Sequence, residues 1–241
     1  MLISAILGMC TKFSEVILAV HFRETNDNGE LVGGPMYYIK NGLKKHWHWL
    51  AFLFSALGVL TVFGTGNATQ VNTITAAVDS ALINYNIISS DSTHIVNLII
   101  GIIIMILIAL IMIGGIKRIG KVTEKLIPFM AVLYIILAIG VVAVNITNVP
   151  AVFKSIFQGA FSPASVTGGA VGSFFMSMKK GVSRGIFSNE AGLGTGSIAH
   201  ACADTRKPVK QGFFGIFEVF VDTIVICTLT ALVILCSDVP V

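Results

Sequence analysis

IVNLIIGIIIMILIALIMI, residues 95–113, contains one polar side chain, Asn97, in an otherwise apolar run. A helix that crosses a bilayer needs roughly 20 mostly apolar residues. This stretch therefore predicts a transmembrane helix, and Leu126–Val144 predicts a second one. The composition agrees, because 55% of the residues are apolar and 12% are charged, whereas soluble domains carry about 25% charged residues. The sequence thus predicts an all-α polytopic membrane protein.

Weaker apolar segments bring the expected number of transmembrane helices to about six. Phe213–Cys236 is apolar apart from Glu218 and Asp222. The remaining three are Ser4–Val20, Gly159–Met178 and a segment that runs from Trp47 to about Gly66 and continues in mixed character towards Asn84. We expect the last to form one long, strongly tilted helix.

Lysine and arginine residues gather in alternate connections between these segments. The basic connections cover residues of about 22–46, 116–125 and 180–209, whereas the other connections contain only Lys154. Cytoplasmic loops of membrane proteins carry an excess of Lys and Arg. We therefore expect the three basic connections to be cytoplasmic loops and both chain ends to lie near the external face.

Several other classes of function have no signal in the sequence. The net charge of +4 comes from short basic patches, which argues against nucleic-acid binding. No HExxH pair, Ser/His pair or paired-Asp arrangement lies within an apolar span, so we expect neither an enzyme nor a cofactor. No CxxC or Cys/His pair predicts a zinc site or a disulfide framework among Cys10, Cys202, Cys227 and Cys236.

Charged side chains inside apolar spans are costly and suggest function. Lys12 and Glu15 lie three residues apart on one helical face, and we expect them to neutralise each other. Gln211, Glu218 and Asp222 also share a face, which indicates either packing against a cytoplasmic segment or ion coupling. The face that carries Glu15 suits close helix packing, because its residues are small or polar: Ser4, Gly8, Thr11, Glu15 and Ala19.

FGTGNATQVNT, residues 63–73, places polar groups on one side if the segment is helical. Asn67, Gln70 and Thr73 recur at every third position, and Gly66 leaves space beside them. Such neutral groups can bind the carboxylate and ammonium of an amino acid. Hydrogen bonding between helices is the alternative.

GAFSPASVTGGAVGSFFMSM, residues 159–178, is only marginally apolar and contains Gly168, Gly169 and Gly172. Glycine costs about 1 kcal/mol relative to alanine inside a helix, so we expect an interrupted helix here. The freed backbone groups of such a helix line a cavity or bind a ligand, as in many secondary transporters. Tight packing of a glycine-rich helix is the alternative.

Four longer motifs carry a family pattern: GGPMYYIKNGL (33–43), GGIKRIGKVTEKLIPFMAVLY (114–134), RGIFSNEAGLGTGSIAHACADTRKPVKQG (184–212) and FEVFVDTIVICTLTALVIL (217–235). Together they resemble the alanine or glycine:cation symporter family, and the resemblance covers nearly the whole chain. It implies a leucine-transporter-like (APC) inverted-repeat fold. It also implies sodium-coupled uptake of alanine or glycine across the plasma (inner) membrane of a bacterium.

The resemblance further implies a substrate site. The residue matching Gln70 contributes to substrate binding, whereas Asn67 and Gly66 are our additions from helical spacing. The glycine-broken helix supplies the other wall, at Thr167, Gly168, Gly169, Gly172 and Phe174.

The chain departs from the family pattern at both ends. The family's first core helix, with its GTGN-type break, and core helices eight to ten are missing. Residues 1–241 therefore resemble core helices 2–7 of one partial transporter domain, and no sodium ligands are assigned because the first and eighth helices supply them. We expect either a symporter of which this is an incomplete chain, or a non-transporting truncated fragment or one part of a split symporter. The expected partners are alanine or glycine, Na⁺, the lipid bilayer and the missing parts of the same transporter.

GVSRGIFSNEAGLGTGSIAHACADTRK, residues 181–207, separates the last two apolar segments. Ser188 and Asn189 before Glu190 indicate the start of a short inner helix, interrupted at Gly192 and Gly194. We expect this stretch to form part of an inner gate, and a fixed linker is the alternative. The expected gating or structural residues are Arg184, Asn189, Glu190, Glu218 and Asp222.

Overall fold

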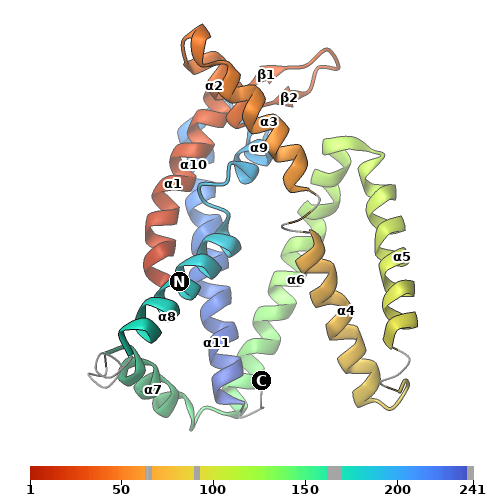
Figure 1. Cartoon of the computed structure of the whole chain (residues 1–241), viewed down its shortest axis with the longest axis vertical. Coiled ribbons are helices and arrows are strands. Elements are labelled where there is room, and N and C mark those ends of the chain that lie inside the picture. Colours follow the sequence, from red (N-terminus) through yellow and green to blue (C-terminus); the bar gives the residue numbers. More distant parts are fainter. Residues whose placement is uncertain (63, 65–66, 90–92, 162–169, 238–241) are drawn as a thin grey trace. The chain divides into compact units, whose positions relative to one another are not determined.

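The computed structural model of the chain describes residues 1–62, 64, 67–89, 93–161 and 170–237, and it is mostly helical (Figure 1). In chain order the elements are α1 Leu2–His21, β1 Glu24–Thr25, β2 Leu31–Val32, α2 Pro35–Gly42, η1 Lys45–Trp47, α3 Trp49–Thr61, α4 Asn67–Asn84, α5 Thr93–Met112, α6 Gly115–Val144, α7 Val149–Phe161, α8 Ala170–Asn189, α9 Thr195–Ala201, α10 Pro208–Val219, the π-helical turn η4 Phe220–Ile226, and α11 Cys227–Cys236. The chain divides into two compact units, Met1–Phe54 with Leu133–Val241, and Ser55–Val132.

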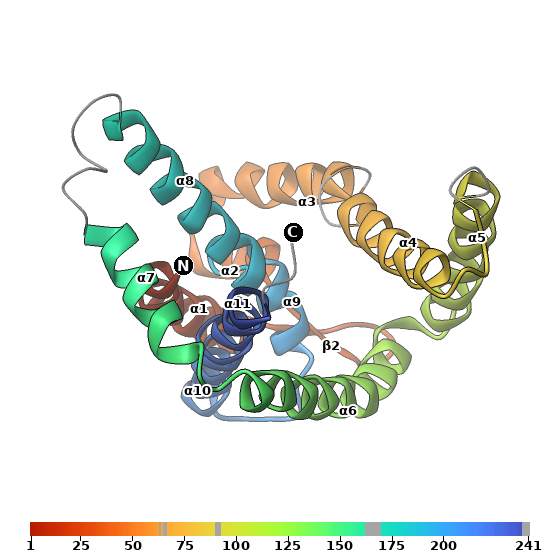
Figure 2. The same cartoon turned by 90° about the horizontal axis from the view of Figure 1, so that it is seen from below.

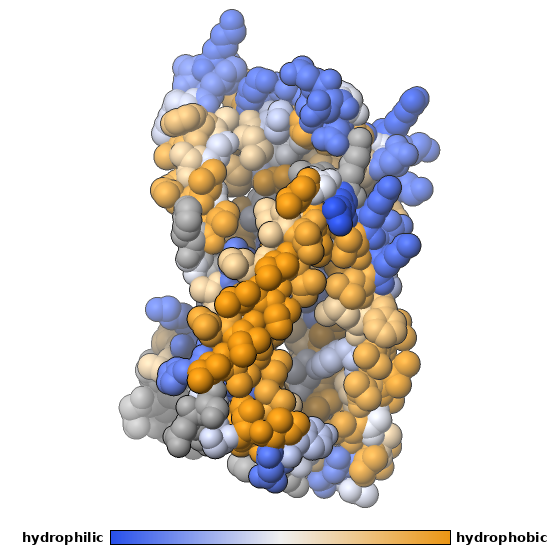
Figure 3. Space-filling view, turned by 90° about the vertical axis from the view of Figure 1, so that its right-hand side faces the viewer, coloured by the Kyte–Doolittle hydropathy of each residue, from blue (hydrophilic) through white to orange (hydrophobic). Residues whose placement is uncertain are grey.

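Four helices among the described residues are long and apolar enough to cross a membrane: Leu2–His21, Thr93–Met112, Arg118–Val144 and Pro208–Cys236. They coincide with four of the expected spans, including the two most apolar ones, and they confirm the predicted class of a helical membrane protein. The band of hydrophobic surface in Figure 3 agrees with this class, since Ile99, Ile103 and Ile106 of α5 are exposed.

The two other expected spans differ from the structure. The segment from Trp47 towards Asn84 is divided into α3 and α4, so the prediction of one long helix is wrong. Helix α3 ends at Thr61, and the amide of Gly64 donates to the Thr61 carbonyl at 3.2 Å in a tight turn, where glycine disfavours a continuing helix. Gly159–Met178 overlaps α7 and α8, and the break expected at Gly168 and Gly169 lies outside the described residues.

The three expected loops contain more regular structure than the sequence suggested. Residues 116–125 belong to α6, and residues 180–209 contain the end of α8, all of α9 and the start of α10. Residues 22–46 form an antiparallel hairpin of β1 and β2 followed by α2. Asn26 closes the hairpin turn, because its side-chain oxygen accepts the backbone amide of Glu30 at 2.8 Å. The side of the membrane on which each segment lies remains a prediction.

In the first unit, α1 packs against α8, α9 and α10, and α8 also contacts η4 (Figures 1 and 2). Small residues permit this close approach, as the stripe of small residues predicted. A Cβ atom at Gly212 of α10 would lie 2.7 Å from a ring carbon of Phe13, and one at Gly8 would lie 3.3 Å from the side-chain nitrogen of Asn189. Ala5, Val16 and Ala19 of α1 are fully buried in these contacts.

Candidate functional site

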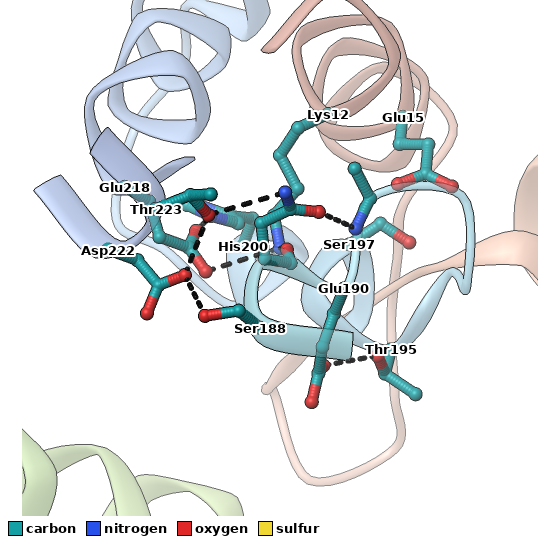
Figure 4. Close-up of polar contacts among 12 residues, drawn as sticks. Lys12, Glu15, Ser188, Glu190, Thr195, Ser197, His200, Glu218, Asp222 and Thr223 are labelled. Carbon is teal, nitrogen blue, oxygen red and sulfur yellow. Dashed lines mark hydrogen bonds and ion pairs between the residues drawn. The ribbon is translucent and has the colours of Figure 1, made fainter. Parts of the chain in front are cut away.

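A cluster of charged and polar side chains lies where α1, α8, α9 and α10 meet (Figure 4). Its centre is Lys12 of α1, which is 1% exposed although it is charged. Its Nζ atom lies 3.2 Å from Oε1 of Glu218 and donates to the carbonyl oxygen of Asn189 at 3.2 Å. A buried ammonium needs such partners, because its desolvation is costly. Lys12 thus connects α1 with α10 and with the end of α8.

Lys12 forms its close ion pair with Glu218 rather than with Glu15, the partner that helical spacing indicated. Glu15 instead accepts the backbone amide of Gly192 at 3.3 Å. Lys12 reaches Glu218 because two glycines leave room for its side chain. A Cβ atom at Gly215 would lie 3.3 Å from the Lys12 Cγ atom, and one at Gly196 would overlap the Lys12 ammonium.

Glu218 also contacts a histidine that the sequence did not single out. Its Oε2 atom lies 2.8 Å from Nε2 of His200, and the other ring nitrogen, Nδ1, lies 2.8 Å from Nε2 of Gln211. In a neutral ring, Nε2–H donates to the carboxylate and Nδ1 accepts from the Gln211 amide. The shared face of Gln211 and Glu218, seven residues apart, was the available signal. It did not identify His200, because that residue lies in a stretch expected to be a loop.

A second group of polar side chains joins the end of α8 to η4. Oδ2 of Asp222 accepts hydrogen bonds from Ser188 at 2.6 Å and from Thr223 at 2.9 Å. The Thr223 hydroxyl accepts a hydrogen bond from the Asn189 side-chain amide at 3.3 Å, and both residues are buried. Glu218 and Asp222 therefore both contact residues of the 180–209 segment, Glu218 through His200 and Asp222 through Ser188.

The turn after α8 corrects the predicted helix start. Ser188 and Asn189 end α8, and the next helix, α9, begins at Thr195 after Gly194. The Asn189 side-chain oxygen accepts the backbone amide of Ala191 at 3.1 Å, so this residue closes a C-terminal turn. Glu190 has a φ of 52°, in the left-handed region, and its carboxylate accepts the Thr195 hydroxyl at 2.6 Å. A short helix, α9, follows this turn, but it begins after both glycines rather than at residues 188–190.

The glycines in this turn have the conformations that interrupt a helix. Gly192 and Gly194 have φ values of 92° and 83°. Glycine adopts this region at no steric cost. Arg184 lies on an exposed part of α8 and Glu190 is also exposed, so neither belongs to the buried cluster.

The predicted substrate residues are only partly visible. Asn67 and Gln70 are exposed on α4, in the second unit. The Asn67 amide donates to the Val62 carbonyl at 3.4 Å. Gly172 and Phe174 belong to α8, in the first unit, and only their backbone is described. Gly66, Thr167, Gly168 and Gly169 lie outside the described residues.

Within the part of the chain that the structure describes, no group of three or more His, Cys, Asp or Glu side chains could bind a metal ion. Cys202, between α9 and α10, is half-buried, and burial raises the pKa of its thiol. A thiol of this kind is a poor nucleophile and a poor metal ligand at neutral pH.

Comparison with known proteins gives a consistent result. The profile of the Sodium:alanine symporter family matches residues 1–240. An uncharacterized transporter of Haemophilus influenzae is 44% identical over 95% of this chain and 48% of its own length. The sodium/alanine symporter AgcS of Methanococcus maripaludis is 41% identical, over 97% of this chain and 49% of its own length. The probable sodium/glutamine symporter GlnT of Bacillus subtilis is also 41% identical, over 99% of this chain and 46% of its own length. The chain thus spans about half the length of the curated relatives it matches.

Proposed function

Because this chain belongs to the sodium:alanine symporter family, we propose that it forms part of a sodium-coupled symporter for a small neutral amino acid, alanine or glycine. The match over residues 1–240 is the observation that carries the proposal. The family consists of symporters rather than enzymes, and the apolar helices fit a multi-pass protein of the plasma membrane.

The proposed fold is leucine-transporter-like, with residues 1–241 corresponding to core helices 2–7 of one partial domain. Four candidate spans and the division of residues 49–84 into α3 and α4 support this assignment. Divided helices near the middle of the membrane are a feature of secondary transporters, because their ends expose backbone groups that bind substrate and ions. The cytoplasmic segments in this proposal are residues 22–46, 116–125 and 180–209.

The residues proposed to bind the amino acid are those that helical spacing and the family resemblance indicated. They are Gln70, Asn67, Gly66, Thr167, Gly168, Gly169, Gly172 and Phe174. Exposure of Asn67 and Gln70 supports this, because neither side chain is buried in a helix contact of its own unit.

The Lys12 cluster has a different part in this proposal. It joins α1, the end of α8, α9 and α10 through charged hydrogen bonds, so these elements resist separation. The inner gate in this proposal is the segment after α8, which contains Glu190. Asn189 at the end of α8, Glu218 of α10 and Asp222 of η4 contact its surroundings, and exposed Arg184 of α8 marks its basic edge. Movement of this gate exposes the substrate site to one side of the membrane at a time.

Uptake into proteoliposomes tests the proposed transport. The protein is reconstituted with an inward sodium gradient, with a proton gradient alone or with no gradient, and labelled alanine and glycine are supplied in turn. We expect accumulation only with sodium, and accumulation with the proton gradient alone would contradict sodium coupling. Gln70→Ala lowers uptake at least tenfold if Gln70 binds substrate. Gln158→Ala, which changes an exposed glutamine of α7, is the matched control and leaves uptake unchanged.

Because the chain spans about half the length of each relative, the uptake assay is run on two preparations. One contains the 241-residue chain alone, and the other contains it together with the remaining half of a relative. Transport in the first preparation shows that residues 1–241 suffice for uptake, and transport only in the second shows that the remaining half is required.

A further inference from the structure

Residues 42–50, GLKKHWHWL, form a basic and aromatic segment between α2 and α3. It contains both tryptophans of the chain, Trp47 and Trp49, and their side chains are 44% and 56% exposed. Lys44, Lys45 and His46 are also exposed. Exposed indole rings beside basic side chains indicate contact with a partner molecule or with the membrane rather than with bulk water.

Contacts with α1 place this segment at the end of a membrane span. The Asn41 amide, at the end of α2, donates to the carbonyl of Phe22, directly after α1. The ring of Phe22 packs under Gly42, where a Cβ atom would lie 3.2 Å from it. Since α1 is a candidate membrane span that ends at His21, residues 42–50 lie beside the end of that span.

The start of α3 gives the same position independently. The helix begins at Trp49 and exposes Phe52 (77%) and Leu53 (40%) within its first turns. The chain therefore changes within a few residues from lysines to exposed apolar rings. Tryptophan is enriched at this depth of a membrane, because its ring is apolar and its N–H group is a hydrogen-bond donor.

The charges near the segment leave two lysines available. Lys40 is engaged, since its ammonium lies 2.9 Å from the carboxylate of Glu24, and Asn41 also donates to that carboxylate at 2.8 Å. No acidic residue occurs in the sequence between Glu30 and Asp79. Among the described residues, Lys44 and Lys45 make no ion pair within the chain.

We propose that Lys44, Lys45, Trp47 and Trp49 form a binding site for the headgroup of an anionic phospholipid. The two ammonium groups contact the phosphate oxygens, and the indole rings lie at the level of the glycerol and upper acyl chain. His46 supports this arrangement, because its ring packs 5.2 Å from that of Trp47. The site concerns the membrane environment, so it stands or falls independently of the proposed transport.

Quenching of tryptophan fluorescence by brominated lipids tests the site. The 241-residue chain is placed in vesicles that contain either brominated phosphatidylglycerol or brominated phosphatidylcholine at increasing mole fraction. Both fluorophores belong to the site, so the signal reports on it alone. A lysine near an anionic surface increases binding about fivefold. We therefore expect phosphatidylglycerol to quench at a mole fraction at least about fivefold lower than phosphatidylcholine does.

The double variant Lys44→Gln/Lys45→Gln removes the charges and keeps the rings. If the proposal is correct, both brominated lipids quench the tryptophan fluorescence of this variant equally. Lys179→Gln/Lys180→Gln changes another exposed pair of neighbouring lysines, on α8, and retains the preference. Equal quenching of the natural chain by the two lipids overturns the proposal, as does a preference that persists in Lys44→Gln/Lys45→Gln. Tryptophans that neither lipid quenches and that aqueous iodide also fails to reach are covered by protein, which overturns it too.

Discussion

The ion pair between Lys12 and Glu218 permits a double-mutant cycle with an unequal outcome. Its two partners differ in burial, because the Lys12 side chain is 1% exposed and the Glu218 side chain is 47% exposed. Removing the carboxylate leaves a buried ammonium, whereas removing the ammonium leaves a carboxylate that water and His200 still solvate. Glu218→Gln is therefore the more damaging of the two changes.

The expected magnitudes follow from the partners that remain. Breaking a buried pair so that one charge is stranded costs about 3–5 kcal/mol. We expect about 3 kcal/mol for Glu218→Gln, since the ammonium retains its hydrogen bond to the Asn189 carbonyl. Lys12→Met removes that hydrogen bond and strands the carbonyl, but it also removes the buried charge, so we expect about 1–2 kcal/mol.

The double variant Lys12→Met/Glu218→Gln contains no stranded ammonium. Its loss of stability is expected to resemble that of Lys12→Met alone, so the coupling energy equals the loss for Glu218→Gln, about 3 kcal/mol. Reversible unfolding in mixed micelles, followed by circular dichroism at several denaturing-detergent fractions, measures all four proteins. The exposed pair of Lys40 and Glu24, 2.9 Å apart, is the matched control, and its cycle yields less than about 1 kcal/mol.

Two results would refute this reasoning. Additive single changes, within about 0.5 kcal/mol, would show that the two charges do not interact in the folded protein. A larger loss for Lys12→Met than for Glu218→Gln would show that the ammonium is solvated in some other way.

Three further predictions use the same unfolding measurement. Gly194→Ala places a Cβ atom 2.5 Å from Pro35 at a φ of 83°, whereas Gly29→Ala has a φ of 74° and no atom within 4 Å of its Cβ. Gly29→Ala is expected to lower the free energy of unfolding by about 1 kcal/mol and Gly194→Ala by more, and equal losses would exclude the clash. The Arg23 guanidinium donates hydrogen bonds to the carbonyls of residues 201, 203 and 205 at the end of α9. Arg23→Lys is expected to lose about 1–3 kcal/mol of stability, because an ammonium lacks the planar fork of donors of a guanidinium, and full stability in that variant would contradict this role. Hydrogen bonds from Lys40 and then Asn41 lower the pKa of Glu24. The stability that Glu24 adds relative to Glu24→Gln is therefore complete above the ordinary pKa of about 4.3, and it disappears as the pH falls through the lowered pKa. A stability difference that grows on acidification would contradict this sign.

The sequence could predict the position of individual apolar helices, because this depends on the residues of each helix alone. Length and hydropathy located Leu126–Val144 and Ile95–Ile113, because a long apolar run has few alternatives to a membrane helix. The division near Gly64 was missed, because a glycine in an apolar run lowers helix propensity by only about 1 kcal/mol, and its outcome depends on tertiary contacts.

The cluster around Lys12 was predictable only in composition. Spacing showed that Glu15 was within reach of Lys12 on the same helix, and it gave no measure of distance to Glu218, which is 206 positions away in the chain. The structure favours the distant partner because α1 and α10 approach closely at glycines. Asn189 was misassigned for a related reason, since a side-chain oxygen can bond a backbone amide at either end of a helix.

Glycine contributes to this region in two physically separate ways. At Gly192 and Gly194 the contribution is conformational, because positive φ values turn the chain from α8 into α9. At Gly196 and Gly215 it is steric, because the missing Cβ atoms leave the space that the Lys12 side chain fills. A hinge would require only the first kind. The second kind fixes α9 and α10 against a buried charge on α1, so the segment after α8 is better suited to move together with these helices than to bend independently of them.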